Sequence, residues 1–301
     1  MSTWSGATPP TPWHGAGTRL LTADGRIFVR TEGSLSSGRA VVLLHGFPTS
    51  CWDYAAAMGR IASEARAPVV TLDLLGSGLS DKPPAFRYSV QDQTDVLLSV
   101  LRGLGLTGVH VVAHDSATSL VAELLARRER DLLRLTVSSA VFVAGTPLRA
   151  VRSSALAEWM APVADRRSAF TKPSSYGTFR REMRRLLAYP ETVSDDELRV
   201  SWELLIRDHG LQHWDRLCAA RDERNESDHR WARALSRIDV PALVLFGDKD
   251  PLAPVSAGER LAAGLKRGRL RVLRDVGHYP HIETPDAFAT EISAFLASVA
   301  D

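Results

Sequence analysis

The amino-acid sequence predicts an α/β protein in which a mostly parallel sheet is covered by helices on both faces. Apolar runs such as residues 40–44 (AVVLL) and 68–72 are continuous, as in strands that are buried on both sides. Helical patterns such as residues 89–104 lie between these runs. Strands that alternate with helices are typical of parallel sheets, because each crossover helix covers one face of the sheet.

The order of the expected elements can be followed along the chain. Residues 1–15 are rich in Pro, Gly, Thr and Ser, and we expect a loose arm there. Residues 18–23 and 26–32 should form a β-hairpin, because Asp24-Gly25 suits a tight turn. Further strands are expected at 40–44, 68–72, 108–112, 135–143, 240–246 and 270–273, and helices at 52–65, 89–104 and 285–299.

The strand pattern is interrupted by a long helical stretch. From about residue 146 to residue 236 no buried strand is evident, and the sequence is dense in Arg, Glu and aromatic residues. We therefore expect a first part of the core at 1–146, a helical cap at 147–236 and a second part of the core at 237–301. The insertion follows the carboxyl end of a strand, so it should cover the edge where open α/β sheets bind ligands.

The most informative stretch joins the strand at 108–112 to a helix through Ala113-His-Asp-Ser-Ala117. A strand, a sharp turn and a helix in this order are the context of a nucleophile elbow. The elbow needs small residues two places before and two places after the nucleophile, and Ala113 and Ala117 meet this need if the nucleophile is Asp115. We therefore favour Asp115 over Ser116, although an Asp at this position is also common as a helix N-cap.

Two more candidates follow later strands. Asp250 lies in the turn Gly247-Asp-Lys-Asp, and His278 follows the strand at 270–273. The order nucleophile, acid, histidine is that of α/β-hydrolases. Asp248, in the same turn as Asp250, is the alternative acid.

Five motifs carry a resemblance to a known family, namely 45–50 (HGFPTS), 72–83 (LDLLGSGLSDKP), 113–115 (AHD), 230–231 (RW) and 278–280 (HYP). On these motifs the chain resembles the α/β-hydrolase superfamily over nearly its whole length. Within the superfamily it resembles the aspartate-nucleophile branch of epoxide hydrolases and haloalkane dehalogenases, and the mesoderm-specific transcript proteins and their bacterial relatives. The resemblance implies an α/β-hydrolase fold, with an eight-stranded, mostly parallel sheet and an inserted helical cap.

The same resemblance implies catalytic roles for Asp115, Asp250 and His278. It favours Asp250 over Asp248, because the family places the acid three residues after the Gly. Asp115 would form an alkyl-enzyme ester, and His278 would then activate a water molecule to hydrolyse it. The backbone N–H groups of Phe47 and Ser116 would form the oxyanion hole. We expect His45 to hold its loop and not to act as a second base.

The substrate depends on how the leaving group is stabilised. Haloalkane dehalogenases resembling this chain have Trp after the nucleophile and Asn after His-Gly, where this chain has Ser116 and Phe47. We therefore expect an epoxide hydrolase, with Tyr176 and Tyr189 of the cap as candidate proton donors. The second cap tyrosine of the family falls near Trp202, which becomes a candidate for substrate contact.

The alternatives are a haloalkane dehalogenase, another hydrolase of the same fold that cleaves esters, and a non-hydrolytic binding module. The last is suggested by the elbow, which lacks the usual glycines.

Composition limits the partners. A net charge of +2 argues against a nucleic-acid partner, and two cysteines are too few for a disulfide framework, so we expect a cytoplasmic protein. No signal peptide and no apolar run of about 18 residues, the length of a membrane span, are evident. His209 and His213 have metal-ligand spacing but no evident third ligand, so we expect no metal and no cofactor. The expected partners are a small apolar organic substrate and water, and the chain could be a monomer or a homodimer.

Overall fold

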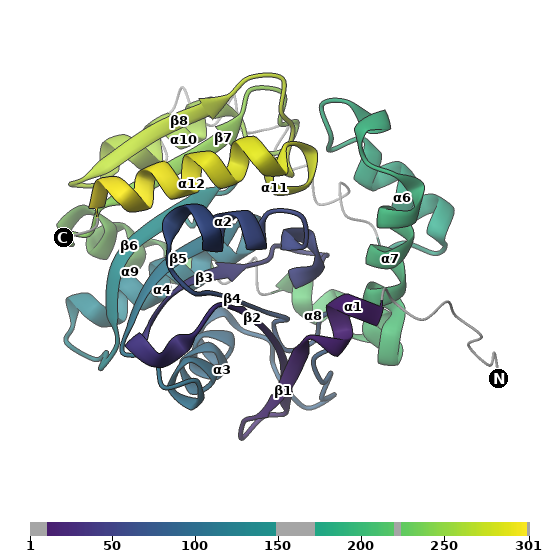
Figure 1. The fold of residues 1–301 in the computed structure, drawn as a ribbon, viewed down its shortest axis with the longest axis horizontal. Helices are drawn as coiled ribbons and strands as arrows, with labels where there is room; N and C mark the ends of the chain where they lie inside the picture. Colours follow the sequence, from purple (N-terminus) through teal and green to yellow (C-terminus); the bar gives the residue numbers. More distant parts are fainter. Residues whose placement is uncertain (1–10, 149–171, 220–223, 300–301) are drawn as a thin grey trace.

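The computed structural model describes residues 11–148, 172–219 and 224–299. These residues form one eight-stranded sheet in the order β1-β2-β4-β3-β5-β6-β7-β8 (Figure 1). β2 is antiparallel to both of its neighbours, and the other neighbouring strands run parallel. The predicted α/β class and the predicted hairpin are thus confirmed. The strands are β1 (Gly17–Leu21), β2 (Arg26–Glu32), β3 (Arg39–Leu44), β4 (Val69–Leu72), β5 (Gly108–His114), β6 (Thr136–Val143), β7 (Ala242–Gly247) and β8 (Gly268–Leu273).

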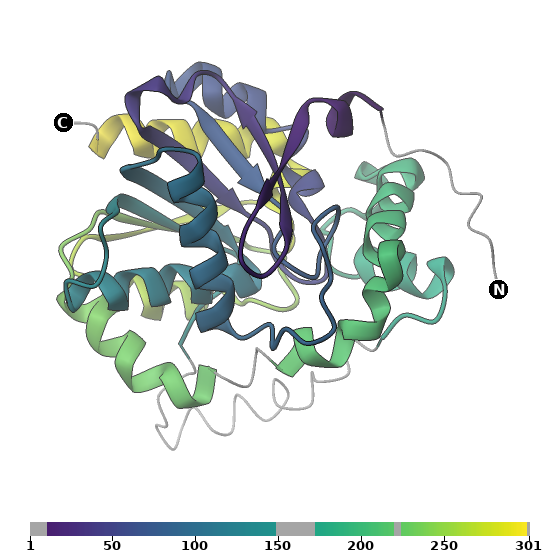
Figure 2. The ribbon, with the colours of Figure 1, turned by 90° about the horizontal axis from the view of Figure 1, so that it is seen from below.

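Two layers of helices enclose the sheet. One layer consists of α2 and α12, and the other of α3, α4, α9 and α10 (Figures 1 and 2). The bounds are α2 (Met58–Ala65), α3 (Val90–Gly103), α4 (Thr118–Glu129), α9 (Arg224–Arg237), α10 (Val255–Gly264) and α12 (Pro285–Val299). Short helical turns η1 (Leu35–Ser37), η2 (Cys51–Tyr54), η3 (Asp115–Ala117) and α11 (Pro280–Glu283) lie in the connections. The single helix predicted at 52–65 is therefore divided into η2 and α2.

β3 is apolar and buried from Ala40 to Leu44 because both faces of the sheet are covered. In β3, Val42 and Leu44 belong to the apolar cluster under α3 and α4, whereas Val41 and Leu43 belong to the cluster under α2 and α12. This alternation is the two-residue period of a strand. Complete burial of such a side chain stabilises the fold by roughly 1.5–3 kcal/mol, so the sheet is a rigid base for the loops at its carboxyl edge.

The described residues between β6 and β7 form helices and no strand. They are α6 (Tyr176–Arg184), η5 (Pro190–Thr192), α7 (Asp195–Ile206), η6 (Arg207–His213), α8 (Trp214–Ala219) and α9. α7 starts with a capping box in which Ser194 and Glu197 each satisfy the other's backbone N–H. α9 differs from the others because it packs against α4 of the core. The predicted cap boundaries remain a prediction.

The Arg230-Trp231 motif explains how α9 is held. The Glu123 carboxylate of α4 accepts hydrogen bonds from Trp231 Nε1 at 2.9 Å, from Arg230 and from Arg127. Burial raises the pKa of Glu123, but hydrogen bonds from Arg230, Trp231 and Arg127 outweigh burial, and the pKa lies below its usual value. The carboxylate is therefore charged and satisfied although it is almost completely buried.

The expected loose arm is wrong for residues 11–15, which form the short helix α1 (Thr11–Gly15). The Trp13 ring is 7% exposed and packs edge-on against Trp52, with a centroid distance of 5.6 Å. The guanidinium of Arg30 lies over the same ring at 4.4 Å. One large aromatic side chain is enough to dock this segment, because it combines apolar area with a cation–π contact.

No helix in the described part of the chain has both the length and the apolar character that crossing a bilayer requires.

Candidate active site

Asp115 occupies a sharp turn between β5 and α4. Its φ angle is 45°, in the left-handed region that few non-glycine residues adopt and that Asp tolerates better than most. Its carbonyl oxygen accepts a hydrogen bond from the Thr118 hydroxyl at 2.6 Å, which fixes the turn at the start of the helix. The side chain is 17% exposed. The strand, turn and helix therefore present this carboxylate at the carboxyl edge of the sheet.

Two glycines from neighbouring strand ends make this turn possible. A Cβ on Gly145 would lie 2.6 Å from the Asp115 carbonyl oxygen, and a Cβ on Gly46 would lie 2.9 Å from Asp115 Cβ. The backbone at the two strand ends thus approaches Asp115 closely at Gly46 and Gly145. The sequence had pointed only to the small elbow residues Ala113 and Ala117. Both alanines are completely buried.

His278 and Asp250 meet beside this carboxylate. His278 Nδ1 donates to Asp250 Oδ2 at 2.8 Å, and His278 Nε2 lies 3.9 Å from Asp115 Oδ1. The Asp250 carboxylate is completely buried, and its Oδ1 accepts the N–H groups of Leu252 and Ala253. The three residues predicted from the sequence are thus brought together, with the histidine between the two carboxylates.

The alternative acid Asp248 points elsewhere. Its Oδ1 accepts the backbone N–H of Asp275 at 2.7 Å and takes no part in orienting His278. Of the two acids in the turn, Asp250 is therefore the one that forms a hydrogen bond with the histidine.

The electrostatics of His278 suit a proton acceptor. Burial lowers the pKa of its imidazole, but the negative charge and hydrogen bond of Asp250, followed by the charge of Asp115, outweigh burial and raise the pKa above its usual value. The hydrogen bond to Asp250 fixes the proton on Nδ1 in the neutral form. Nε2 is then free to accept a proton on the side of Asp115.

His45 occupies both of its ring nitrogens in holding two loops. Nδ1 contacts the carbonyl oxygen of Gly46 at 2.8 Å, and Nε2 accepts the N–H of Leu74 at 3.0 Å. This bonding assigns the neutral ring with the proton on Nδ1. The imidazole therefore joins the loop after β3 to the loop after β4.

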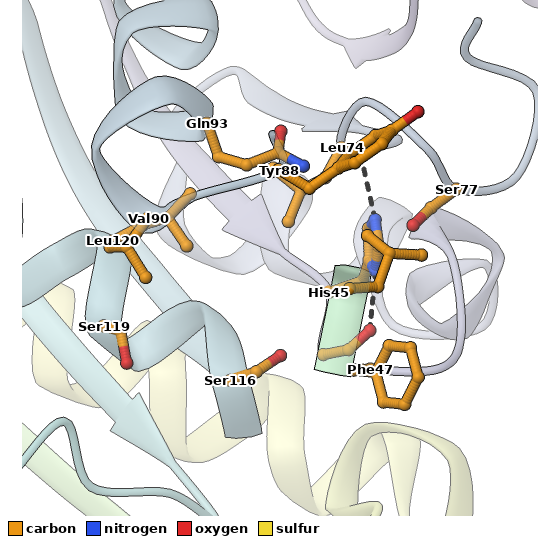
Figure 3. A pocket seen from close by; sticks show the side chains of 12 residues that line it. His45, Phe47, Leu74, Ser77, Tyr88, Val90, Gln93, Ser116, Ser119 and Leu120 are labelled. Carbon is orange, nitrogen blue, oxygen red and sulfur yellow. Dashed lines mark hydrogen bonds between the residues drawn. The ribbon is translucent and has the colours of Figure 1, made fainter. Parts of the chain in front are cut away.

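An apolar pocket lies next to the elbow (Figure 3). Phe47, His45 and Ser116 line it together with residues from several elements, including Leu74, Tyr88, Val90, Leu120 and Leu217. The Phe47 ring packs on Trp214 of α8 with a centroid distance of 4.7 Å, so the inserted helices close one side. In Figure 3 the hydroxyl of Ser116 points toward the Phe47 ring. Such a pocket suits a small apolar molecule.

A comparison with protein families agrees with this geometry. The family model described as "Alpha/beta hydrolase family" matches residues 41–291. The chain belongs to this family.

Similar proteins match this alpha/beta hydrolase over almost the whole length of its chain. A putative hydrolase LipZ of Mycobacterium tuberculosis (strain ATCC 25618 / H37Rv) is 32% identical, covering 92% of this chain and 94% of its own. The mesoderm-specific transcript homolog protein of Bos taurus is 30% identical, covering 95% of this chain and 87% of its own. A crystal structure of a putative lipase (lip1) from Acinetobacter baumannii AYE has a TM-score of 0.79 at 20% identity, covering 96% of this chain and 93% of that chain.

Neither of the two tyrosines predicted as proton donors lines the pocket of this alpha/beta hydrolase, and both hydroxyls have other partners. The Tyr176 hydroxyl donates to the carbonyl oxygen of Asp195 at 2.9 Å, and the Tyr189 hydroxyl donates to Asp275 Oδ1 at 3.2 Å on the surface. Trp202 packs against Phe179 with a centroid distance of 5.6 Å, inside the cluster of the inserted helices. None of the three lines the pocket next to Ser116.

The pair His209 and His213 lies in η6, where Asp208 and His209 have φ angles of 48° and 60°. The helical spacing inferred from the sequence is therefore broken. His209 is exposed, whereas His213 is buried against Tyr88.

Glu283 is a residue of the site that the sequence did not reveal. Its carboxylate accepts the N–H groups of Ala188, Gly277 and Tyr279 at 2.7–3.0 Å. Glu283 thus fixes the loop on both sides of His278 and joins it to the inserted segment after α6. An acid five residues after the histidine was the available signal, but its three partners are backbone groups that leave no pattern in the sequence.

Proposed function

We propose that this alpha/beta hydrolase acts through a covalent ester on Asp115 and that it opens epoxides. The observation that supports the proposal best is the position of His278 Nε2, 3.9 Å from Asp115 Oδ1, with Nδ1 bound to Asp250. A buried histidine that is oriented by one carboxylate and faces another is suited to hydrolyse an ester formed on the second.

In the first step a carboxylate oxygen of Asp115 attacks an epoxide carbon. The ring C–O bond breaks, its electron pair goes to the epoxide oxygen, and an ester joins the substrate to the enzyme. In the second step His278 Nε2 takes a proton from a water molecule, whose oxygen attacks Cγ of Asp115. The tetrahedral intermediate collapses and the diol oxygen leaves with the proton from His278. The Asp115 carboxyl group then loses the second proton of the water molecule, which balances the proton that the epoxide oxygen takes up, and the carboxylate is restored.

The oxyanion of the second step would form on Asp115 itself. We assign its stabilisation to the N–H groups of Ser116, at the start of the helical turn, and of Phe47, after β3. Both residues line the pocket. A well-placed donor of this kind contributes about 3 kcal/mol to the stabilisation of the transition state.

The alkoxide that leaves in the first step needs a hydrogen-bond donor. Tyr176 and Tyr189 were predicted for this role from the sequence, but their hydroxyls are bound to Asp195 and Asp275. Tyr88 lines the pocket, but burial raises its pKa to about 12, and its hydroxyl donates to Pro83. We therefore propose that the hydroxyl of Ser116 donates the hydrogen bond to the leaving oxygen.

A haloalkane is the second candidate substrate. The positions of Tyr176 and Tyr189 favour it, since a halide leaves without a proton and does not need a tyrosine acid. The first and second steps at Asp115 and His278 would be the same, so the two candidates differ in the leaving group alone.

A single turnover in ¹⁸O-labelled water, followed by mass analysis of the peptide that contains Asp115, tests the covalent step. We expect the label in the Asp115 carboxylate, because water attacks Cγ of the ester. The substrate panel should contain aryl and alkyl epoxides, matched bromoalkanes and simple esters. Diol formation without label on Asp115 would contradict the mechanism. Bromide release without diol would select the dehalogenase, ester cleavage without labelled Asp115 would select an esterase, and binding without turnover would select the non-hydrolytic module.

A further inference from the structure

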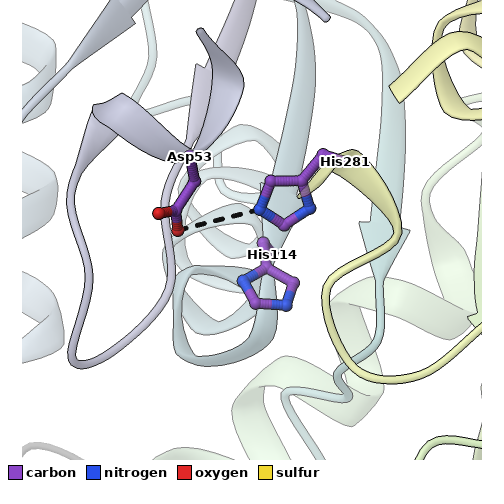
Figure 4. Close-up of side chains that lie close together, drawn as sticks. All are labelled: Asp53, His114 and His281. Atoms are coloured by element: carbon purple, nitrogen blue, oxygen red, sulfur yellow. Dashed lines mark ion pairs between the residues drawn. The ribbon is translucent and has the colours of Figure 1, made fainter. Parts of the chain in front are cut away.

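A second cluster of polar side chains lies behind the elbow, away from the pocket. Asp53 comes from η2, His114 from the end of β5 and His281 from α11, and all three side chains are buried (Figure 4). One oxygen or nitrogen of each lies within 4.8 Å of the others. None of the three lines the pocket next to Ser116. The cluster is therefore distinct from the substrate site.

Several atoms of this cluster have no hydrogen-bond partner among the described residues. They are Asp53 Oδ1, His114 Nδ1 and both ring nitrogens of His281. Asp53 Oδ2 and His281 Nε2 are 3.7 Å apart, which is too long for a hydrogen bond. Buried polar atoms are normally satisfied, because leaving them unpaired is unfavourable. These four buried atoms lie in one place, and the described residues supply no partner for them.

The other polar atoms of His114 and Asp53 make hydrogen bonds that are typical of metal ligands. His114 Nε2 donates to the carbonyl oxygen of His278 at 2.8 Å, which leaves the lone pair on Nδ1. The Thr49 hydroxyl donates to Asp53 Oδ2. Metal-binding histidines commonly donate their second ring N–H to a backbone carbonyl, and metal-binding carboxylates accept a further hydrogen bond.

Aromatic rings hold the third residue. His281 stacks on Tyr54 with a centroid distance of 4.7 Å and meets the His114 ring edge-on at 4.6 Å. The ring of His281 is thus fixed in place by packing, while neither of its nitrogens has a hydrogen-bond partner among the described residues, so that one of them can bind an ion.

We propose that Asp53, His114 and His281 bind a divalent transition-metal ion of the zinc class. Two imidazole nitrogens and one carboxylate oxygen form a ligand set that Zn²⁺ and Fe²⁺ use in proteins. The ion would join η2, the last residue of β5 and α11. Since His114 directly precedes Asp115 and α11 follows His278, such a site stabilises the arrangement of the elbow and the histidine loop. Its role is structural, and it does not depend on the reaction proposed above.

The metal content of the purified full-length chain tests this site. We expect about one ion per chain after expression with added Zn²⁺, since binding to such a ligand set is coupled to folding. Co²⁺ added to chelator-treated protein should give visible absorption bands, and Zn²⁺ should raise the melting temperature of the same protein. Absence of a stoichiometric metal together with no thermal shift by Zn²⁺ or Co²⁺ would overturn the proposal.

Variants of the proposed ligand residues test where the ion binds. Asp53→Asn and His281→Gln should each lose the bound metal and the Co²⁺ absorption. His110→Gln is the matched control, because His110 lies on the same strand as His114 but binds Ser139 at 2.8 Å, outside the cluster. Metal retained in both cluster variants, or lost from the control alone, would contradict the assignment. If a cluster variant does not fold, the Co²⁺ spectrum and the chelator response of the unaltered chain still decide.

Discussion

The backbone N–H of His278 donates a hydrogen bond to the carbonyl oxygen of Leu186, 2.8 Å away. Leu186 belongs to the inserted helical segment, whereas His278 belongs to the core. A Cβ on Gly277 would lie 2.5 Å from the same carbonyl oxygen, so the two segments are in close backbone contact. The position of the histidine is therefore set partly by the insertion, and the predictions below depend on this geometry.

Replacement of Asp115 by Ala should abolish turnover, because the variant cannot form the ester. Ser116→Ala should reduce the rate by only about tenfold, the equivalent of one hydrogen bond to the leaving oxygen, because its backbone N–H is kept. Steady-state rates on the best substrate, with circular dichroism to verify folding, test both. An active Asp115→Ala variant beside an inactive Ser116→Ala variant would assign the nucleophile to Ser116.

His278→Gln should stop the reaction after the first step. Ester formation needs only Asp115, whereas hydrolysis needs the imidazole as a base. Intact-mass measurement should show the chain plus one substrate molecule. Asp248→Asn is a matched control and should turn over without accumulating this adduct, since Asp248 binds the Asp275 N–H and not His278. Absence of an adduct on His278→Gln with a substrate that the unaltered enzyme hydrolyses would contradict the two-step scheme.

The pH profile should report the raised pKa of His278. The base must be neutral, so turnover rises with pH through the folded-state pKa, and the midpoint of the acid limb should lie above the usual value of 6.5. Asp250→Asn removes the largest effect that raises this pKa, while burial continues to lower it. The midpoint should then move to lower pH, and the plateau rate should fall by about 10³–10⁴. A midpoint that stays in place or moves to higher pH would show that another group controls the limb.

Tyr176→Phe and Tyr189→Phe should each change epoxide turnover by no more than a few-fold. Both hydroxyls are bound away from the pocket, and general-acid help worth about 10²–10⁴ in rate would need one of them beside the substrate. Rates for both variants on an aryl epoxide and on a bromoalkane provide the measurement. A loss of that size on the epoxide alone would identify the tyrosine as the acid and would require the cap to move on binding.

Gly145→Ala should destabilise the fold and distort the elbow. The new methyl group would lie 2.6 Å from the Asp115 carbonyl oxygen, and overpacking of this kind costs about 1–3 kcal/mol of unfolding free energy. Gly59→Ala is the control, because Gly59 lies in α2 with no atom within 4 Å of the new Cβ, and it should stabilise the chain by about 0.5–1 kcal/mol. Urea denaturation measures both. Equal effects of the two substitutions would disprove the close contact at the elbow.

The positions of the catalytic candidates could be predicted because each of them follows the carboxyl end of a strand. Parallel strands place their carboxyl ends at one edge of the sheet, so Asp115, Asp250 and His278 had to lie near one another once the strands were recognised. The small residues Ala113 and Ala117 then pointed to Asp115 in place of its neighbour.

The positions of Tyr176 and Tyr189 relative to the site could not be predicted in the same way. A helical period shows which residues share a face, and Phe179 and Met183 of α6 are indeed buried together. It does not fix how far that face lies from Asp115, which depends on contacts such as those of Leu186 with the histidine loop.

The cluster of Asp53, His114 and His281 illustrates a second limit. Each residue is unremarkable in the sequence, and the three come from segments far apart in the chain. Their meeting results from η2, β5 and α11 packing together, which no local pattern records.

The Glu123 carboxylate holds α9 at the point where the chain returns from the insertion to the sheet. Because Trp231 and Arg230 fix this return point on α4, the path into β7 and on to Asp250 is set within the core. Much of the insertion can therefore change in length and sequence through evolution without displacing the acid from the histidine. Residues 186–188 are an exception among the described residues, since they bond to the His278 loop and to Glu283. Transplanting a cap from a relative onto this chain should succeed where these contacts are kept.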